Sequence, residues 1–369
     1  MANITKSKGG VFMKCSTQFK ALAKWAALAA CAGYGPSALA QSSLTLYGLA
    51  DSYIEYRSNN RSSADSSSSG GSALRMNSGG LSGSRWGLRG VEDLGGGTQA
   101  VFALESGFYM HTGAMGEAGR PFNRQAFLGL NGPYGMLSLG RQYISMFDLL
   151  PAFMPLTYAG AYEPMPFLMG NLRLDNSVKY RVATGSLAAQ AHYQLDDASG
   201  APYQRSAWGG GVSYLSGPFG LAAVYDQSGG VAAAASNRLR KLALAATYAP
   251  DPWRLTIGYR WAQDKTATGN LNQRDDMWWI GVGYRISPVL RITAAFYYDD
   301  VKARAGAGNP SNPRQHALQL VYGGLSKRTD LYAAAAYARN SALNFAPLST
   351  LPAGKDSQAA VALGIRHKF

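Results

Sequence analysis

The fold class is decided by the stretch PWRLTIGYRWAQD, residues 252–264. Large apolar side chains occupy every second position, and arginine, threonine or glycine fills the positions between them. The apolar set is Leu255, Ile257, Tyr259 and Trp261, and the alternate set is Arg254, Thr256, Gly258 and Arg260. Successive side chains of a β-strand point to opposite faces, so this period of two predicts a strand with one apolar face.

The same alternation recurs along the chain, for example in residues 278–286 and 289–299. Sixteen segments of this kind lie at about 42–56, 82–92, 98–110, 122–131, 135–147, 177–184, 186–196, 206–215, 219–227, 238–249, 252–264, 275–286, 289–301, 314–325, 328–339 and 358–369. A tilted membrane strand needs about ten residues, which is the length of many of these segments. The sequence therefore predicts an all-β fold, a 16-stranded antiparallel transmembrane β-barrel.

The connections between the segments alternate in length. Short polar turns, such as 132–135 and 287–288, alternate with longer loops at 58–80, 111–121, 148–176, 265–274, 302–313 and 340–357. Short turns on one rim and long loops on the other are typical of outer-membrane barrels. An even number of strands would place both chain ends on the short-turn rim, which is the periplasmic one.

Composition excludes several other classes of protein. Only 15% of the 369 residues are charged, against about 25% in a typical soluble domain. No segment after residue 40 offers about 18 consecutive apolar residues, so no transmembrane helix is expected there. A hydrophobic content of 47% is too high for a disordered chain.

The first 40 residues are predicted to be a removable signal peptide. They carry five lysines and no acid, then an apolar run from Trp25 to Ala32, and end in small residues at Ala38 and Ala40. This order is typical of secretory signals, and cleavage after Ala40 would leave residues 41–369 as the barrel. Met13 is an alternative start. Residues 28–31, LAAC, resemble a lipobox, which keeps lipidation as an alternative to simple cleavage.

The exported part of the chain has no cysteine, because Cys15 and Cys31 both lie in the leader. We expect no disulfide, no metal site and no cofactor. Without the five leader lysines, 30 basic residues face 21 acidic ones, a net charge of +9. An exported chain has little access to nucleic acid, so none is expected as a partner.

Several strings together resemble the trimeric general porins of Gram-negative outer membranes, in the form common in beta-proteobacteria. They are SSLTLYGLAD (42–51), SGSRWGLRGVEDLGGG (82–97), NRQAFLGLNGPYGMLSLGRQY (123–143), NSVKYR (176–181) and GIRHKF (364–369). The resemblance implies a passive diffusion channel for ions and small hydrophilic solutes. It also implies that the third outer loop, at 148–176, folds into the pore.

The resemblance implies partners as well. The chain would form a homotrimer, with loop 111–121 reaching over a neighbour, and would contact outer-membrane lipid and lipopolysaccharide. The terminal Phe369 would belong to the signal read by the barrel-assembly machinery. Small residues in the first and last strands are compatible with subunit packing: Gly48, Ala50, Ala359, Ala360 and Gly364.

The chemistry of a pore is the field at its constriction. The resemblance places basic residues there at Arg85, Arg124 and Arg173, with Arg89 and Arg141 as further candidates. Arg85 and Arg89 alternate with Trp86 and Leu88, so the pattern alone predicts that both point into the lumen. Arg124 and Arg141 share parity with Leu128 and Leu139, and the pattern does not settle their direction.

The candidate acidic residues of the constriction are Asp148, Glu163 and Glu105. Strand parity adds a basic lumen wall at Arg254, Arg260, Arg285 and Arg291, with Arg366 in the last strand. The third loop carries few acids, while other general porins have a conspicuously acidic one. Because fixed cations in a narrow pore concentrate anions, we expect an anion preference.

Three other functions compete with this interpretation. A solute-specific outer-membrane channel would share the whole pattern. An outer-membrane barrel hydrolase would need a serine paired with His192 or His316, and no G-x-S-x-G elbow or H-E-x-x-H pair is present. A secreted all-β binding protein would be extracted without detergent.

Overall fold

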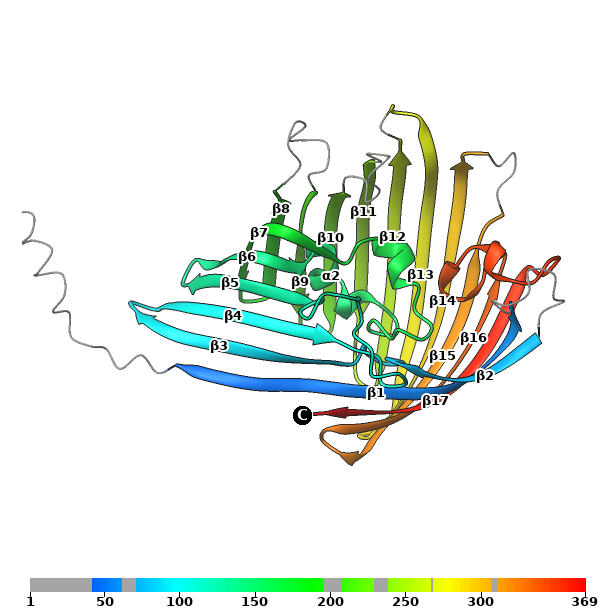
Figure 1. Ribbon diagram of the computed structural model, residues 1–369, viewed down its shortest axis with the longest axis horizontal. Helices are drawn as coiled ribbons and strands as arrows, with labels where there is room; N and C mark the ends of the chain where they lie inside the picture. Colours follow the sequence, from blue (N-terminus) through cyan, green and yellow to red (C-terminus); the bar gives the residue numbers. More distant parts are fainter. Residues whose placement is uncertain (1–41, 62–70, 196–206, 229–237, 267, 307–310) are drawn as a thin grey trace, which may run out of the picture. The chain divides into compact units, whose positions relative to one another are not determined.

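The computed structural model describes residues 42–61, 71–195, 207–228, 238–266, 268–306 and 311–369 (Figure 1). The predicted signal peptide lies outside the described residues. The strands are β1(Ser43–Asn60), β2(Gly71–Ser78), β3(Arg85–Gly95), β4(Thr98–Gly107), β5(Gln125–Gly132), β6(Gly135–Tyr143), β7(Arg173–Thr184), β8(Leu187–Gln194), β9(Trp208–Ser216), β10(Phe219–Ser228), β11(Arg238–Tyr248), β12(Trp253–Lys265), β13(Leu271–Ser287), β14(Leu290–Arg304), β15(Arg314–Ser326), β16(Thr329–Arg339) and β17(Ser357–Lys368).

These strands close into one antiparallel ring. Consecutive strands pair from β3 to β17, and β1 pairs with β17 from Leu49 opposite Lys368 to Arg57 opposite Ala360. Both β2 and β3 pair with β1, one beyond the other, so they are two pieces of the same wall strand. With those two counted as one, the wall has sixteen strands, which confirms the predicted barrel.

The wall strands show the predicted alternation as a pattern of exposure. In β12, Leu255 and Ile257 are exposed on the outside, while Thr256, Gly258 and Arg260 are buried on the inside. Aromatic pairs lie on the outer face, among them Trp253 with Tyr284 and Phe219 with Tyr248. An apolar outer band with aromatic girdles suits contact with lipid.

The second wall strand is interrupted, which the sequence pattern did not predict. Residues 58–80 were expected to be one long loop, but β2 lies within them. At the break, the Asp51 carboxylate of β1 accepts hydrogen bonds from the amides of Gly80, Leu81 and Ser82 at 2.8–3.0 Å. These bonds replace the strand pairing that is lost there. The Tyr332 hydroxyl of β16 also donates to Asp51, at 2.6 Å.

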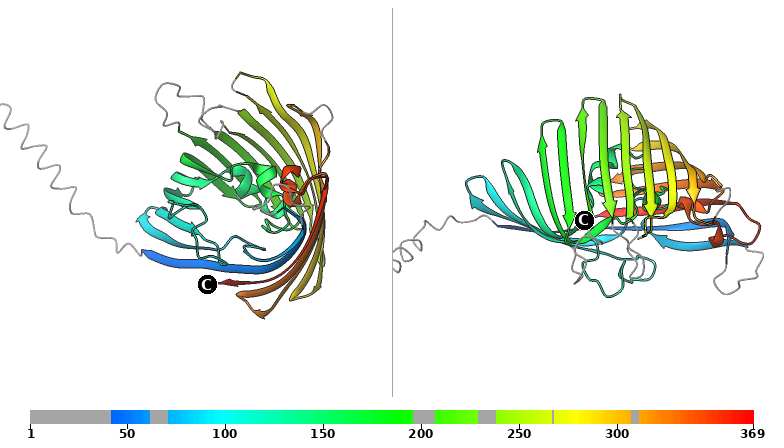
Figure 2. Two further views of the ribbon diagram at one scale, coloured as in Figure 1. Left: turned by 45° about the vertical axis from the view of Figure 1, so that its right-hand side comes forward. Right: turned by 90° about the horizontal axis from the view of Figure 1, so that it is seen from above.

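Residues 144–172 (loop 144–172) leave the wall after β6 and return to it at β7. They contain the short helices α2(Ser145–Leu149), η1(Pro151–Phe153) and α3(Met165–Met169). Figure 2 shows these helices within the curve of the wall strands. The predicted strand 135–147 was thus too long, because Ile144 already precedes a helix. None of the helices in the described residues is long and apolar enough to cross a membrane.

The hydrophobic core lies between loop 144–172 and the wall. Leu150, Phe153, Met154, Leu168 and Met169 are fully buried. They belong to one cluster with small wall residues, including Ala222, Ala243 and Ala245. Small side chains on the inner face leave space for the loop's large ones, and each such burial contributes about 1.5–3 kcal/mol.

Seven short turns and both described chain ends lie at the same rim of the wall. Gly48 and Phe369 exchange two backbone hydrogen bonds of 3.0 Å there. Positive φ angles at Gly185 and Gly217 let two of the turns close. Of the small residues proposed for subunit packing, Ala360 and Gly364 share parity with the buried Gln358 and Ala362. They therefore face inward, and a Cβ at Gly364 would collide with Tyr332.

Candidate functional site

Three arginines from separate strands lie close together, and two of them pair with one carboxylate. Arg85 begins β3, Arg124 immediately precedes β5, and Arg173 begins β7. Glu105, near the end of β4, accepts a hydrogen bond of 2.8 Å from Arg124 and lies 3.5 Å from the Arg85 guanidinium. We call Arg85, Arg124 and Arg173 the arginine group. With Glu105 as the one carboxylate among them, the group retains an excess of two positive charges.

Tyrosines complete the group. The Tyr47 hydroxyl donates to Glu105 at 3.1 Å, and the Tyr143 hydroxyl donates to the other carboxylate oxygen at 3.3 Å. Arg173 donates to the Tyr143 hydroxyl at 3.3 Å. Arg173 therefore joins the group through a tyrosine, since no carboxylate among the described residues is paired with it.

Arg89 lies on the same inner face as Arg85. It stands opposite Thr45 in the β1–β3 pairing, and Tyr47 stands opposite Gly87. Arg89 is exposed and has no ion-pair partner among the described residues. It is therefore four residues nearer the short-turn rim than Arg85 and adds a positive charge without an ion-pair partner at that level.

Arg141 does not join the group, which corrects its assignment to the constriction. In the β5–β6 pairing it stands opposite Ala126, next to the exposed pair Leu128 and Leu139. Its guanidinium is bound to Asp175 at 2.6 Å and to Glu117 at 3.1 Å. Two carboxylate partners therefore balance the charge of Arg141, and it is not paired with Glu105. Arg124 has the parity of the outward residues of β5, but it precedes the first residue of that strand, so its side chain can turn inward to Glu105.

Two of the three candidate acids do not form an acidic wall. Asp148, in α2, is paired with Lys179 of β7. Glu163 is buried and accepts hydrogen bonds from the Leu156 amide at 2.9 Å, from the Tyr158 amide and from the Tyr297 hydroxyl at 2.7 Å. Burial raises the pKa of the Glu163 carboxyl, and these donors oppose that rise. Its role is to hold the loop, and Glu105 is the acid that lies among arginines.

Two arginines of the predicted lumen wall bind backbone carbonyls of the loop. Arg254 donates to the carbonyls of Ala152, Met154 and Pro155 at 2.8–3.2 Å. Arg260, only 3% exposed, donates to the Phe167 carbonyl at 3.0 Å and pairs with Asp275. Both lie on the inner face, as the strand pattern predicted, but their guanidiniums donate hydrogen bonds to backbone carbonyls of the loop.

The other two arginines of that wall lie near the short-turn rim. Arg285 of β13 stands directly opposite Arg291 of β14, and Arg285 pairs with Asp251. Arg254, Arg285 and Arg291 line one recess of about 670 Å³. Arg291 is exposed and has no ion-pair partner in the described part of the chain. Like charges directly opposite each other destabilise the pairing of two strands. Because Arg291 has no partner carboxylate among the described residues, this rim carries a local positive charge.

Further cations that sequence reasoning missed also clamp the loop. Lys179 donates to the Tyr143 carbonyl at 2.9 Å, and Lys241 donates to the Met169 carbonyl. Lys241 also pairs with Asp226, its direct opposite in the β10–β11 pairing. For Lys241 the sequence held a signal, because strand parity places Lys241 and Asp226, which have opposite charges, on the inner faces of neighbouring strands.

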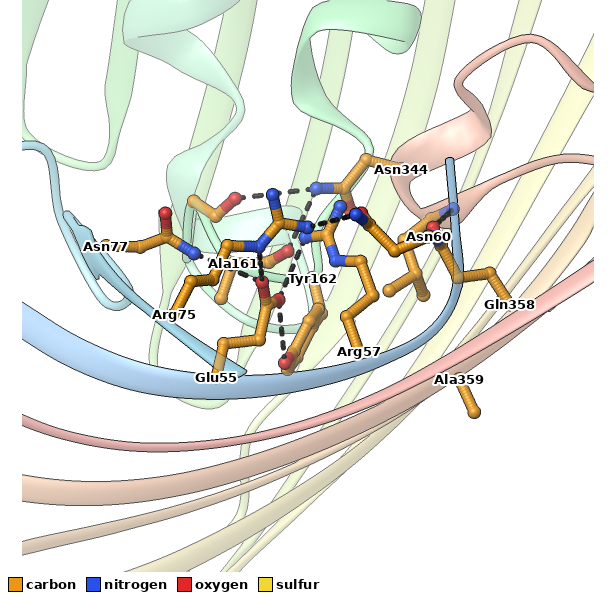
Figure 3. A network of polar contacts seen from close by, with 12 residues as sticks. Glu55, Arg57, Asn60, Arg75, Asn77, Ala161, Tyr162, Asn344, Gln358 and Ala359 are labelled. Carbon is orange, nitrogen blue, oxygen red and sulfur yellow. Dashed lines mark hydrogen bonds and ion pairs between the residues drawn. The ribbon is translucent and has the colours of Figure 1, made fainter. Parts of the chain in front are cut away.

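A second charged network, around Glu55, pins the middle of the loop (Figure 3). The fully buried Glu55 pairs with Arg57 at 2.8 Å and with Arg75 at 3.2 Å. It also accepts a hydrogen bond of 3.1 Å from the Tyr162 hydroxyl. Asn344, from the last long loop, donates to the Ala161 carbonyl at 2.9 Å. The sequence pattern gave no reason to select Glu55.

Ser145, His192 and Asp226 form a buried chain of contacts. The Ser145 hydroxyl lies 2.9 Å from His192 Nδ1, and His192 Nε2 lies 3.4 Å from Asp226. The Ser145 amide also donates to Nδ1 at 3.1 Å, so this nitrogen is an acceptor and the ring proton belongs on Nε2. Ser145 is 0% exposed and Asp226 is engaged by Lys241. The contacts anchor the start of the loop.

Comparisons with known proteins place the chain among bacterial channels. A family model described as Gram-negative porin matches residues 25–343. An outer membrane porin protein of Bordetella pertussis is 31% identical, covering 93% of this chain and 98% of that protein. Outer membrane porin protein 32 of Delftia acidovorans is 28% identical, with the same coverage.

Solved structures agree. An anion-selective porin from Comamonas acidovorans has a TM-score of 0.76 and 26% identity, covering 89% of this chain and 100% of that one. OmpT of Vibrio cholerae has a TM-score of 0.67 at 15% identity, covering 89% and 98%, which supports the fold alone.

Proposed function

Since this chain belongs to the Gram-negative porin family and is an outer-membrane channel protein, we propose that it is an anion-preferring diffusion channel whose constriction is formed by the arginine group and loop 144–172. The observation that carries the proposal is the excess of positive over negative charge around Glu105. The guanidiniums of Arg85 and Arg124 pair with it, and that of Arg173 is held nearby by Tyr143. The loop's own candidate acids are paired or buried.

The electrostatic consequence can be estimated. An excess of two charges about 5 Å from a monovalent anion in water is worth about 1–2 kcal/mol. A difference of about 1.4 kcal/mol is a factor of ten in occupancy. Screening lengths fall from about 10 Å at 0.1 M salt to about 3 Å at 1 M, so the preference should fade as the salt concentration rises. The Comamonas relative is titled an anion-selective porin, which supports the same direction.

The decisive experiment is the zero-current potential of the purified protein in a planar bilayer with a tenfold KCl gradient. We expect the anion-selective sign at low salt and a smaller potential at high salt. Arg85→Gln and Arg173→Gln should each reduce it. Arg366→Gln should matter less, because Arg366 is already paired with Asp330 at 2.6 Å. A cation-selective sign in the native protein at low salt would refute the proposal.

We propose no hydrolytic activity. The Ser145–His192–Asp226 contacts have the residue types of a serine hydrolase, but Ser145 is fully buried and its own amide occupies His192 Nδ1. A nucleophile needs access to substrate and a free base. The test is labelling with a fluorophosphonate probe, and modification of Ser145 in the folded protein would contradict this assignment.

We propose that the mature protein spans residues 41–369 and assembles as a homotrimer, in contact with lipid and lipopolysaccharide after delivery by the barrel-assembly machinery. The outward positions of Ala50 and Ala359 leave space for close packing, whereas the space beside Gly48 is filled by the Phe369 ring. N-terminal sequencing of the membrane-extracted protein tests cleavage after Ala40. Native mass spectrometry that finds only monomer in mild detergent would contradict the trimer.

A further inference from the structure

Tyr143, the last residue of β6, lies at the junction between the arginine group and loop 144–172. Its hydroxyl accepts a hydrogen bond from Arg173 and donates one to Glu105, each at 3.3 Å. A phenol can do both at once. Glu105 in turn holds Arg124 and Arg85. One neutral hydroxyl therefore links Arg173 to the other two guanidiniums.

The aromatic ring of Tyr143 makes a second set of contacts with the same arginines. The Arg173 guanidinium carbon lies 4.8 Å from the ring centroid, and that of Arg124 lies 5.9 Å from it. Both distances fall within the range of cation–π attraction. The ring is 8% exposed, so little water screens these contacts.

The stack continues into the loop. Phe147 of α2 lies parallel to Tyr143, with centroids 4.2 Å apart and an interplanar angle of 12°. Tyr158 follows at 4.8 Å from Phe147, and its hydroxyl donates to the Phe147 carbonyl at 2.9 Å. The next contact is Glu163, which accepts the Tyr158 amide. A continuous path of contacts between buried and half-buried side chains thus runs from the arginine group to the centre of the loop.

Three like charges with one carboxylate repel one another and need fixed supports to stay close together. Arg85 and Arg124 have Glu105, whereas in the described part of the chain Arg173 has the Tyr143 hydroxyl and ring. We propose that Tyr143 is a positioning residue for selectivity: it fixes where Arg173 and Arg124 present their charges and couples that geometry to the packing of the loop. This inference rests on the proposed anion preference.

The test uses substitutions that leave the net charge unchanged. Tyr143→Phe removes the hydroxyl and keeps the ring, Tyr143→Leu removes both, and Phe147→Leu removes the stacked partner while leaving both hydrogen bonds. The control is Tyr53→Phe, a buried tyrosine of β1 outside the arginine group. The readout is the zero-current potential in a tenfold KCl gradient at low salt, with heat-dependent gel mobility reporting barrel integrity.

We expect the anion-to-cation permeability ratio to fall about twofold to threefold in Tyr143→Phe, because the two hydrogen bonds of the hydroxyl are lost while the ring and all the charges remain. Tyr143→Leu should approach Arg173→Gln, and Phe147→Leu should shift the ratio in the same direction. Tyr53→Phe should match the native protein. If charge alone set the selectivity, the Tyr143 and Phe147 variants would all keep the native permeability ratio.

The outcomes separate the two proposals. If Arg173→Gln lowers the ratio and Tyr143→Phe does not, the positioning role is wrong while the anion preference stands. If Phe147→Leu alone leaves the ratio unchanged, the coupling to the loop is wrong. If Arg173→Gln also has no effect, the arginine group does not set selectivity and both proposals fail. Should Tyr143→Leu not fold, Tyr143→Phe decides the question.

Discussion

The Tyr297 hydroxyl of β14 donates a hydrogen bond of 2.7 Å to the Glu163 carboxylate of loop 144–172, across 134 positions of the chain. Both side chains are buried between the loop and the wall. Together with the carbonyl contacts of Arg254 and Lys241, this bond holds the loop against the inner face. The width of the channel is therefore set largely by groups that no solute touches.

Tyr297→Phe should loosen the loop. The change removes one of the three donors to Glu163, which costs about 1.5–3 kcal/mol for a buried bond to a charged group. We expect a larger and noisier single-channel conductance and a lower unfolding temperature. Tyr337→Phe, on the outer face, is the matched control. Equal conductance in the two variants would show that the bond does not hold the loop.

The titration of Glu163 gives a pH dependence of known sign. Burial raises the pKa of this carboxyl above its ordinary value of 4.5, so the folded protein binds the proton more tightly than the unfolded chain does. The stabilising contribution is complete below 4.5 and is lost as the pH rises through the folded pKa. We expect acidification from pH 7 to pH 5 to stabilise the native protein relative to Glu163→Gln in thermal unfolding. The opposite slope would mean that the three donors favour the carboxylate more than burial opposes it.

Arg254→Gln and Arg291→Gln should differ although each removes one positive charge from the same recess. Arg254 holds three loop carbonyls, whereas Arg291 has no ion-pair partner among the described residues. We expect Arg254→Gln to raise conductance and increase voltage-dependent fluctuation, and Arg291→Gln to leave both close to native. Equal effects would assign Arg254 a purely electrostatic role.

Arg260→Met should be the most destabilising change of a single wall residue. It would leave Asp275 and the fully buried Asp299 without their cation, and breaking a buried pair costs about 3–5 kcal/mol. The measurement is the temperature at which the folded form is lost on a gel. Replacing Arg260 together with Asp275 and Asp299 by apolar residues should recover much of the loss, and no recovery would contradict the charge-based explanation.

Arg141→Gln should leave selectivity almost unchanged, in contrast to Arg173→Gln. Its charge is already paired with Asp175 and Glu117. The zero-current potential compares the two variants directly. A shift as large as that of Arg173→Gln would return Arg141 to the lumen.

The architecture was predictable because alternation recurs in sixteen segments and seven short turns separate pairs of them, so the same hypothesis is tested many times. The interruption at residues 79–84 was not, since it depends on Asp51 supplying acceptors for three amides. Parity is a local property, and that bond set joins positions about 30 residues apart. An alternation of period two also gives no signal for the short helices inside loop 144–172.

For the site, parity correctly placed Arg85, Arg89, Arg254 and Arg260 on the inner face, but it could not say what each arginine would meet there. Arg254 and Arg260 meet carbonyls of the loop, while Arg89 meets none of the described carboxylates. Glu163 shows the same limit, because an acid in a loop can face solute or bond to its own backbone. Only the three-dimensional packing distinguishes these cases.

The interruption of the second wall strand makes closure of the barrel and docking of the loop a single cooperative event. Asp51 binds the amides of the break and the Tyr332 hydroxyl, which reaches it from β16 across the junction of β1 and β17. The Gly80 carbonyl at the break accepts the Ala161 amide of the loop at 3.1 Å. The bond set of Asp51 cannot be complete until the first and last strands have met, because Tyr332 comes from the C-terminal side of that junction. In a barrel that is still open, the contacts that hold the loop are incomplete. The width of the channel is therefore set in the final step of folding, when the barrel closes.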